Sequence, residues 1–280
     1  MSPRPSVDVV VPAMAPKLAA ARLAELTTGV GDTLTVVDNR PEAEPRDAGP
    51  VQILAAPERQ SSYYARNRGA AAGKAEWLLF LDADVQFDAD LLDRLFATSP
   101  ATDTGVLAGT VVDEVLADTA VARWLRDRAA MGQEQTLDRP WPYAQTAHCA
   151  VRREAFEAAG GFREDIRSGG DADLCFRLAA RGWGLERRDA SVRHAARASA
   201  AAVLRQMARH GAGAAWLERE HPGSFPERDR PLGLAWWLAR SLPQARAAAL
   251  MPPAAALAFS LGRRLPNEVG RSRRLDRLLR

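Results

Sequence analysis

Four large apolar residues run directly into two aspartates at residues 78–84, which read Leu-Leu-Phe-Leu-Asp-Ala-Asp. An apolar run this short, bounded by polar residues, is typical of a buried strand. Asp82 and Asp84 would then lie at the carboxyl edge of a sheet, where ligands bind in open α/β folds. Two carboxylates this close repel each other unless a cation lies beside them. We therefore predict a site for a metal ion and a phosphorylated ligand, although a solvated acidic turn has the same local pattern.

Apolar runs and helical segments alternate over the first 112 residues. The apolar runs predict strands at 7–11, 34–37, 51–54, 77–81 and 105–112, with a Pro- and acid-rich loop at 40–50. Helical spacing and capping residues predict helices at 18–26, 61–72 and 88–97. This alternation is typical of a parallel, mostly buried sheet flanked by helices. A helical and loop-like stretch at 113–145 precedes a second α/β segment at 146–194 and a helix at 198–220.

Composition excludes several classes of protein. The chain has 280 residues, of which 47% are apolar and 26% charged, and only Lys17 and Lys74 among its 38 basic residues are lysine. Neither a nucleic-acid-binding motif with interleaved aromatic residues nor a signal-peptide core is visible. Cys149 and Cys175 lack metal-binding spacing, so we interpret them as buried thiols in a reducing compartment. We expect a cytoplasmic protein without nucleic-acid partners.

Two common nucleotide-binding motifs are missing from the sequence. No G-x-G-x-x-G follows the first predicted strand, and no G-x-x-x-x-G-K-[ST] occurs. These absences disfavour a standard dinucleotide-binding fold and a P-loop. The ligand at the predicted sheet edge must be held in another way.

Other polar and glycine residues stand at defined places among the predicted elements. They are Asp38 after the second strand, Arg66-Asn67-x-Gly69 on the next helix, Gly160-Gly161-Phe162, Gly170-Asp171-Ala172-Asp173 with Arg177, and His194 after a late strand. From Val7 to about His194 this set resembles the bacterial family 2 glycosyltransferases, inverting enzymes of the GT-A fold. The block that contains residues 65–70 and 77–84 looks most like that family, and the spacing between blocks makes the resemblance specific.

The resemblance implies the fold, the ligands and the role of each site residue. The fold would be of the GT-A type, with a Rossmann-like, mostly parallel central sheet. The donor would be a UDP- or GDP-linked sugar, with Mn²⁺ or Mg²⁺ on its diphosphate. The implied nucleotide-binding residues are Pro12, Asp38, Arg66 and Asp82, the metal ligands are Asp84 and His194, and the general base is Asp171.

General chemistry is consistent with these roles. A divalent cation would neutralise the charge that develops on the diphosphate leaving group. An inverting transfer needs one base, which takes the proton of the acceptor hydroxyl. Asp171 is also placed to cap the helix that follows it, and the two roles are compatible. A core or surface histidine would equally explain His194. Gly69 is expected to allow close packing of helix on sheet, whereas Asn67 would contact the diphosphate or the nucleoside.

Two positions depart from the family pattern. Asn39 stands where a second acid often follows the base-binding Asp38, which leaves the preferred base open. Gly170 replaces the usual glutamate before Asp171, which leaves an acceptor contact open. These departures are the support for one alternative, a non-catalytic scaffold that binds sugar nucleotides. A nucleotidyltransferase is the other alternative, but its Gly-rich basic loop is absent from residues 12–17.

The sequence predicts a division near residue 220. Residues 1–220 would form the catalytic domain, with a nucleotide-sugar half at about 1–112 and an acceptor half at about 113–220. Residues 221–280 would form a helical, Arg-rich extension. Its part from 231 onward either packs on the domain or on a second subunit, giving a homodimer, or contacts the cytoplasmic face of a membrane through Trp, Leu and Arg side chains. Pro243, Pro252 and Pro253 would interrupt any long helix there.

Overall fold

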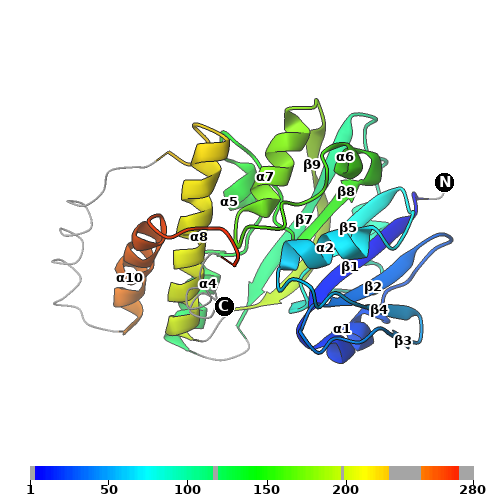
Figure 1. Ribbon diagram of the computed structural model, residues 1–280, viewed down its shortest axis with the longest axis horizontal. Helices are drawn as coiled ribbons and strands as arrows, with labels where there is room; N and C mark the ends of the chain where they lie inside the picture. Colours follow the sequence, from blue (N-terminus) through cyan, green and yellow to red (C-terminus); the bar gives the residue numbers. More distant parts are fainter. Residues whose placement is uncertain (1–3, 116–118, 197–198, 227–246, 271–280) are drawn as a thin grey trace. The chain divides into compact units, whose positions relative to one another are not determined.

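The computed structural model describes residues 4–115, 119–196, 199–226 and 247–270 (Figure 1). The chain divides into two compact units. The first comprises Met1–Val112, Met131–Glu164 and Asp171–His194, and the second comprises Asp113–Ala130, Asp165–Gly170 and Ala195–Arg280.

The described strands form one nine-stranded mixed sheet. Their order is β3-β4-β2-β1-β5-β8-β7-β9-β6. The strands are β1 (Val7–Ala13), β2 (Thr33–Asp38), β3 (Arg46–Ala48), β4 (Val51–Ala55), β5 (Trp77–Leu81), β6 (Val85–Gln86), β7 (Thr104–Glu114), β8 (His148–Arg152) and β9 (Gly184–Ala195). The strand β1 pairs in parallel with β2 and β5, and β2 with β4, whereas β8 runs antiparallel to β5 and β7. The predicted parallel arrangement therefore holds for the first half of the sheet.

Helices cover both faces of the sheet. They are α1 (Pro16–Leu23), α2 (Ser62–Ala70), α3 (Leu91–Leu95), α5 (Glu134–Leu137), α6 (Arg153–Ala158) and α7 (Gly170–Ala179). Because side chains alternate along a strand, Val9 and Val11 of β1 join the core cluster that contains α1 and α3 residues, while Val10 faces α2. Figure 1 shows α2 lying across the near face of β1 and β2.

Gly69 sets the distance between α2 and the sheet. A Cβ atom at this position would lie 2.4 Å from Val10 Cγ1 and 3.0 Å from Val37 Cγ2. Any larger residue would therefore push the helix away from β1 and β2. The predicted packing role of Gly69 is confirmed.

Most predicted elements are present, with differences in the limits of three of them and one additional strand. The strand β1 continues through Pro12. Proline has no N–H to donate, and it is tolerated here because the pairing of β1 with β5 already ends at Val10, which leaves Pro12 aligned only with β2. The short strand β3 lies in the loop predicted at 40–50, where its polar residues carry no apolar signal. The helix α1 begins with Pro16 at its first turn, and α3 begins at Leu91 rather than at Asp88.

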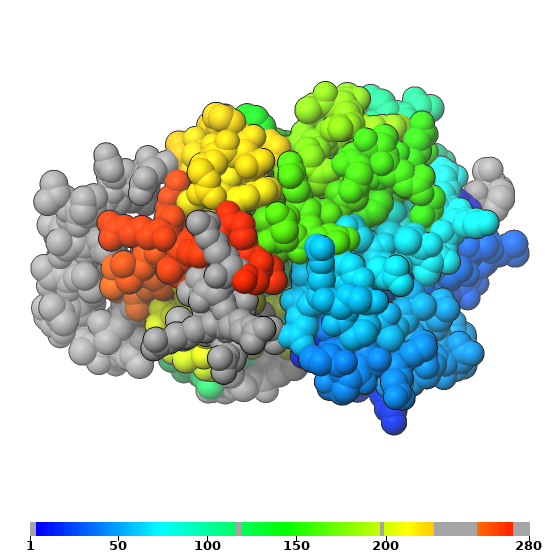
Figure 2. All heavy atoms as spheres, in the orientation of Figure 1, coloured from blue at the N-terminus to red at the C-terminus, as the bar shows by residue number. Residues whose placement is uncertain are grey.

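The second unit contains α4 (Ala120–Asp127), α8 (Ala200–Glu220) and α10 (Ala247–Gly262). Helices α8 and α10 lie in direct contact (Figure 2). A Cβ atom at Gly211 would lie 2.1 Å from the Phe259 carbonyl oxygen, and one at Gly262 would lie 2.1 Å from the Ala208 carbonyl oxygen. The two glycines thus let the helix backbones approach closely.

The C-terminal predictions are only partly described by the structure. Contrary to expectation, α10 continues through Pro252 and Pro253, where its packing against α8 supports the helix despite two missing N–H donors. No helix within the described ranges is long and apolar enough to cross a membrane. Residues 227–246, which include Pro243 and the Trp-rich part of the predicted anchor, and residues 271–280 lie outside the described residues.

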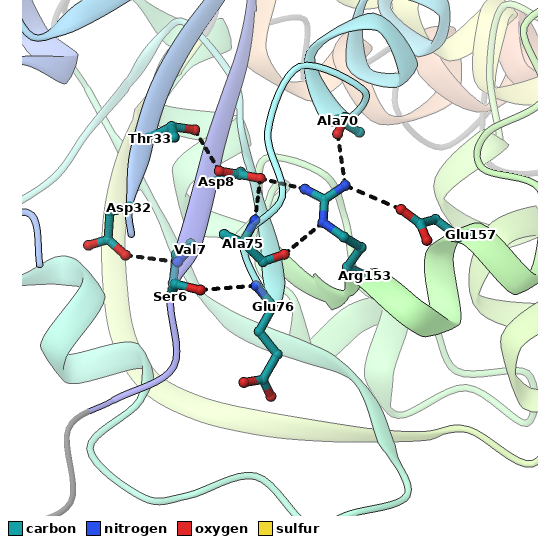
Figure 3. A network of polar contacts seen from close by, with 10 residues as sticks. All are labelled: Ser6, Val7, Asp8, Asp32, Thr33, Ala70, Ala75, Glu76, Arg153 and Glu157. Atoms are coloured by element: carbon teal, nitrogen blue, oxygen red, sulfur yellow. Dashed lines mark hydrogen bonds and ion pairs between the residues drawn. The ribbon is translucent and has the colours of Figure 1, made fainter. Parts of the chain in front are cut away.

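A buried ion pair joins the amino ends of the central strands (Figure 3). Asp8, only 1% exposed, accepts hydrogen bonds from Thr33 Oγ1 at 2.6 Å, from the Ala75 backbone N–H at 2.9 Å and from Arg153 Nη2. Arg153 also donates to the backbone oxygens of Ala75 and Ala70. This network ties β1, β2, the α2–β5 loop and α6 together.

Replacement of Arg153 by methionine should destabilise the fold by about 3 kcal/mol, because it leaves the Asp8 carboxylate buried without its cation. Urea unfolding measures the change. The matched control is Arg187→Met, whose partner Asp138 is 66% exposed, and it should cost about 1 kcal/mol or less. Equal losses in the two variants would contradict the structural role of Arg153.

His148 lies inside the sheet with its ring against Gly109. It is 0% exposed, and its Nδ1 lies 3.3 Å from the Thr110 carbonyl oxygen. A Cβ atom at Gly109 would lie 2.1 Å from His148 Cε1, and Nε2 has no hydrogen-bond partner among the described residues. Burial lowers the pKa of His148 to about 4, with a small opposing effect of the Thr110 carbonyl. The ring is therefore neutral in the folded protein at pH 7.

Acidification should destabilise the protein through His148. The pKa of His148 is about 6.5 in the unfolded chain and about 4 in the folded protein. The contribution of the neutral ring to the free energy of unfolding is therefore complete above pH 6.5 and is lost as the pH falls toward 4. Between pH 7 and 4.5, the unfolding free energy of the wild type should fall by about 2 kcal/mol more than that of His148→Gln. Identical pH profiles in denaturant unfolding would show that His148 does not titrate in this way.

Candidate active site

Strand register brings three of the predicted site residues to one sheet edge. In the parallel pairing of β1 and β2, Pro12 lies opposite Val37 and Ala13 opposite Asp38. In the pairing of β1 and β5, Val10 lies opposite Phe80, so Asp82 follows close to the level of Pro12. The carboxyl ends of β1, β2 and β5 therefore meet, as the sequence predicted.

Arg66 and Asp82 form an ion pair at this edge. Arg66 lies on α2, which Ser61 caps by accepting a hydrogen bond from the Tyr64 N–H. Arg66 Nη2 donates to Asp82 Oδ1 at 2.6 Å, with side-chain exposures of 4% for Arg66 and 33% for Asp82. Its Nε has no hydrogen-bond partner among the described residues. The edge thus carries a buried cation with an unused donor.

Asp171 lies in the electric field of this ion pair. It sits in the first turn of α7 and is half-buried, and its Oδ1 accepts a hydrogen bond from the Ala172 N–H at 3.0 Å. Burial raises the pKa of Asp171, the Ala172 N–H and Arg66 oppose the rise, and Asp82 adds to it. Because α7 already begins at Gly170, Asp171 lies inside the helix rather than at the capping position.

Asp173 and Arg177, which follow Asp171 on α7, hold a glycine turn in place. The Asp173 carboxylate is buried and lies 2.8 Å from Arg177 Nη2. Arg177 also donates to the backbone oxygens of Ala159 at 2.5 Å and Gly161 at 2.8 Å. The turn at Gly160 and Gly161 has positive φ angles of 75° and 69°, which favour glycine. The second acid of the motif is therefore structural.

Asn67 supports the same turn. Its Nδ2 donates to the Phe162 carbonyl oxygen at 2.9 Å, and its Oδ1 accepts from the Phe162 N–H at 2.9 Å. A further bond joins Nδ2 to Glu164 Oε1 at 2.9 Å. The sequence suggested a ligand contact for Asn67, but its amide is engaged within the fold. It thereby links α2 to the segment before α7.

Asp84 and His194, the two residues predicted as metal ligands, lie together. The strand β6 pairs with β9 so that Val85 is opposite His194. Asp84 Oδ2 lies 3.5 Å from His194 Nε2, with side-chain exposures of 53% and 3%. No group of three His, Cys, Asp or Glu residues suited to a metal occurs within the described part of the chain. One carboxylate and one imidazole fit a divalent cation that also takes ligand oxygens from a diphosphate.

The Asp38 carboxylate forms an ion pair with Arg40, a residue that is not among the predicted site residues. The Asp38 side chain is 0% exposed, and Arg40 donates to it through Nε at 2.9 Å and Nη2 at 2.7 Å. These hydrogen bonds lower the pKa of Asp38. Asn39 points elsewhere, because its Nδ2 donates to the Ser61 carbonyl oxygen at 3.1 Å. The sequence could have indicated this ion pair, because Arg40 is a basic residue only two positions after Asp38.

Comparison with known proteins identifies the central part of the chain. Residues 32–160 match the model of the family "Glycosyl transferase family 2". The chain is 30% identical to the pre-mycofactocin glycosyltransferase of Mycobacterium tuberculosis over 178 aligned residues. The alignment covers 61% of this chain and 38% of that protein. The chain therefore spans well under half the length of this curated relative.

Solved structures resemble the whole fold. The mannosyltransferase PcManGT from Pyrobaculum calidifontis matches with a TM-score of 0.57 and 19% identity, over 99% of this chain and 79% of that chain. GalNAc-T7 matches with a TM-score of 0.50 and 13% identity, over 70% of this chain and 45% of that chain. Both are glycosyltransferases of the GT-A fold, which confirms the predicted architecture. Residues 32–160 thus match family 2 of the glycosyltransferases, and the fold is of the GT-A type.

Proposed function

We propose that this chain transfers a sugar from a UDP- or GDP-linked donor to an acceptor hydroxyl, with inversion at the anomeric carbon. The observation that carries the proposal is the grouping of Asp171 with the Arg66–Asp82 ion pair, next to the Asp84–His194 pair. The two solved structures support the class of donor: PcManGT is in complex with GDP-Man and Mn²⁺, and GalNAc-T7 with UDP, GalNAc and Mn²⁺.

The sheet edge supplies the nucleotide contacts. Arg66 keeps an unpartnered Nε–H in a buried position, and a donor oxygen would satisfy it. Asp82 is one-third exposed beside Arg66 and can accept a hydrogen bond from a ribose hydroxyl. Pro12 ends the neighbouring strand β1 on this side of the site, and Asp38 ends β2, where its carboxylate is paired with Arg40.

Asp84 and His194 would hold a divalent cation together with the diphosphate. Imidazole suits Mn²⁺ better than Mg²⁺, so we favour Mn²⁺. When bound, such a cation neutralises the charge that develops on the departing diphosphate. Burial of the His194 ring, only 3% exposed, fixes its direction toward Asp84.

Asp171 would act as the general base. Its raised pKa makes its carboxylate a stronger proton acceptor than an exposed aspartate. The acceptor oxygen forms the bond to the anomeric carbon as its proton passes to Asp171, and the bond to the diphosphate oxygen breaks. One base on the face opposite the leaving group is sufficient for inversion.

The non-catalytic alternative loses its main support. Asn39, one of the two departures from the family pattern, has a structural reason in its hydrogen bond to the Ser61 carbonyl. Gly170, the other, occupies the first position of α7 immediately before Asp171. Neither departure removes a group on which the proposed chemistry depends.

Replacement of Asp171 by asparagine should leave donor binding unchanged but slow turnover by about 100-fold or more, because the amide cannot accept the proton. Since the acceptor is unidentified, the assay follows release of UDP or GDP from UDP- and GDP-sugars with Mn²⁺, where water takes the acceptor's place. Asp189→Asn, an exposed position on β9, is the control and should behave like the wild type. Near-normal turnover in Asp171→Asn would exclude Asp171 as the base.

Replacement of Asp84 by alanine should remove the metal-dependent part of nucleotide affinity. Removal of a group that only orients a metal ligand lowers metal affinity by about tenfold or more. Removal of a ligand itself should therefore lower the Mn²⁺-dependent affinity for UDP or GDP by at least about tenfold. Calorimetry of UDP and GDP binding, with and without Mn²⁺, measures it. The exposed Asp90→Ala is the matched control. Unchanged Mn²⁺ dependence in Asp84→Ala would refute the assignment.

A further inference from the structure

Asp38, to which the family resemblance assigns contact with the nucleobase, is already engaged by Arg40. Asp38 Oδ1 accepts hydrogen bonds from the Arg40 backbone N–H at 3.2 Å and from Arg40 Nε at 2.9 Å, and Oδ2 accepts from Nη2 at 2.7 Å. The Asp38 side chain is 0% exposed, whereas that of Arg40 is 28% exposed. At this edge of the sheet, the group that reaches solvent is therefore the guanidinium.

The geometry of the ion pair leaves a second fork on Arg40. A guanidinium has five N–H donors in a rigid plane. Asp38 takes the edge formed by Nε and Nη2, so one N–H of Nη1 and one of Nη2 remain parallel on the outer edge. Glu42 Oε1 lies 3.6 Å from Nη1 but is 68% exposed, so this contact is weak and readily exchanged.

A parallel pair of donors selects among the nucleobases. Guanine offers two adjacent acceptors, O6 and N7, and this is the pair that arginine contacts most often in a specific way. Adenine presents an acceptor beside a donor on the same edge. Uracil places an N–H between its two carbonyl oxygens, which suits a free carboxylate rather than a guanidinium. Cytosine also has two adjacent acceptors, N3 and O2, but the ribose on N1 lies beside O2 and crowds that edge. Guanine is therefore the base that best matches the outer fork of Arg40.

We propose that Arg40, positioned by Asp38, reads the base of the donor and selects a guanine nucleotide. This inference rests on the proposed function, because it takes the end of β2 as the base side of the site. It assigns Asp38 a positioning role: the buried carboxylate fixes the plane of the guanidinium. It also assigns Arg40 the specificity that Asn39, turned toward Ser61, does not supply.

Calorimetry on the full chain with Mn²⁺ tests the proposal with GDP, UDP, ADP and CDP as probes. GDP should bind at least about tenfold more tightly than each of the others. Arg40→Lys keeps the charge but lacks the fork, and should bring GDP to within about threefold of UDP. Asp38→Asn should reduce the preference for GDP in the same direction, because an amide cannot hold the guanidinium in place. Thermal unfolding of each variant verifies that it is folded.

The control variant is Arg46→Ala, which removes a nearby positive charge that also acts on Asp38 but makes no hydrogen bond to it. It should retain the preference for GDP. An equal loss of preference in Arg46→Ala would overturn the proposal, because charge alone would then explain it. Tighter binding of UDP, ADP or CDP, or a preference for GDP that survives Arg40→Lys, would overturn it while leaving the proposed function intact. Failure of all four nucleotides to bind would instead overturn the proposed function.

Discussion

The parallel pairing of β1 with β2 and β5 is the constraint on which the site depends. It places the ends of three buried strands at one edge, where Asp38, Pro12 and Asp82 follow one another across the sheet. The pairing is itself supported at the opposite edge by the buried Asp8–Arg153 network. Gly69 lets α2 approach these strands, which brings Arg66 within 2.6 Å of Asp82. Chemistry at one edge therefore depends on packing beneath it and on an ion pair at the other end.

The acids of the site differ mainly in their partners. Asp82 is paired with Arg66, Asp38 with Arg40 and Asp173 with Arg177, while Asp84 faces His194. Among the ion pairs of the described residues, Asp171 has none, and burial raises its pKa. The pKa of Asp38 is lowered by its hydrogen bonds to Arg40, which is the opposite direction from that of Asp171, the proposed base.

Two sets of structural contacts hold Asp171, the proposed base, in place. Asn67 fastens α2 to the backbone of Phe162, and Arg177 fastens α7 to the backbone of Ala159 and Gly161. Helices α2 and α7, which carry the proposed donor-binding Arg66 and the proposed base Asp171, are thus joined through one glycine turn. The residues that the sequence grouped into motifs divide in the structure into those that face the site and those that orient them. Asp171 and Arg66 belong to the former, Asp173 and Asn67 to the latter.

The sequence by itself determined strands β1, β2, β4, β5 and β7, the sheet edge and the family resemblance, because apolar runs, capping residues and motif spacing are local properties of the chain. Through the family resemblance it also proposed Asp84 and His194 as metal ligands, and their Oδ2 and Nε2 atoms lie 3.5 Å apart. Only the tertiary structure decided which groups interact. It pairs Asp38 with Arg40, uses the amide of Asn67 to bind the backbone of Phe162, and makes β8 antiparallel to β5. Those contacts depend on side-chain direction and on pairing between distant segments. Neither leaves a periodic signal in sequence, as the polar strand β3 and the buried ring of His148 also illustrate.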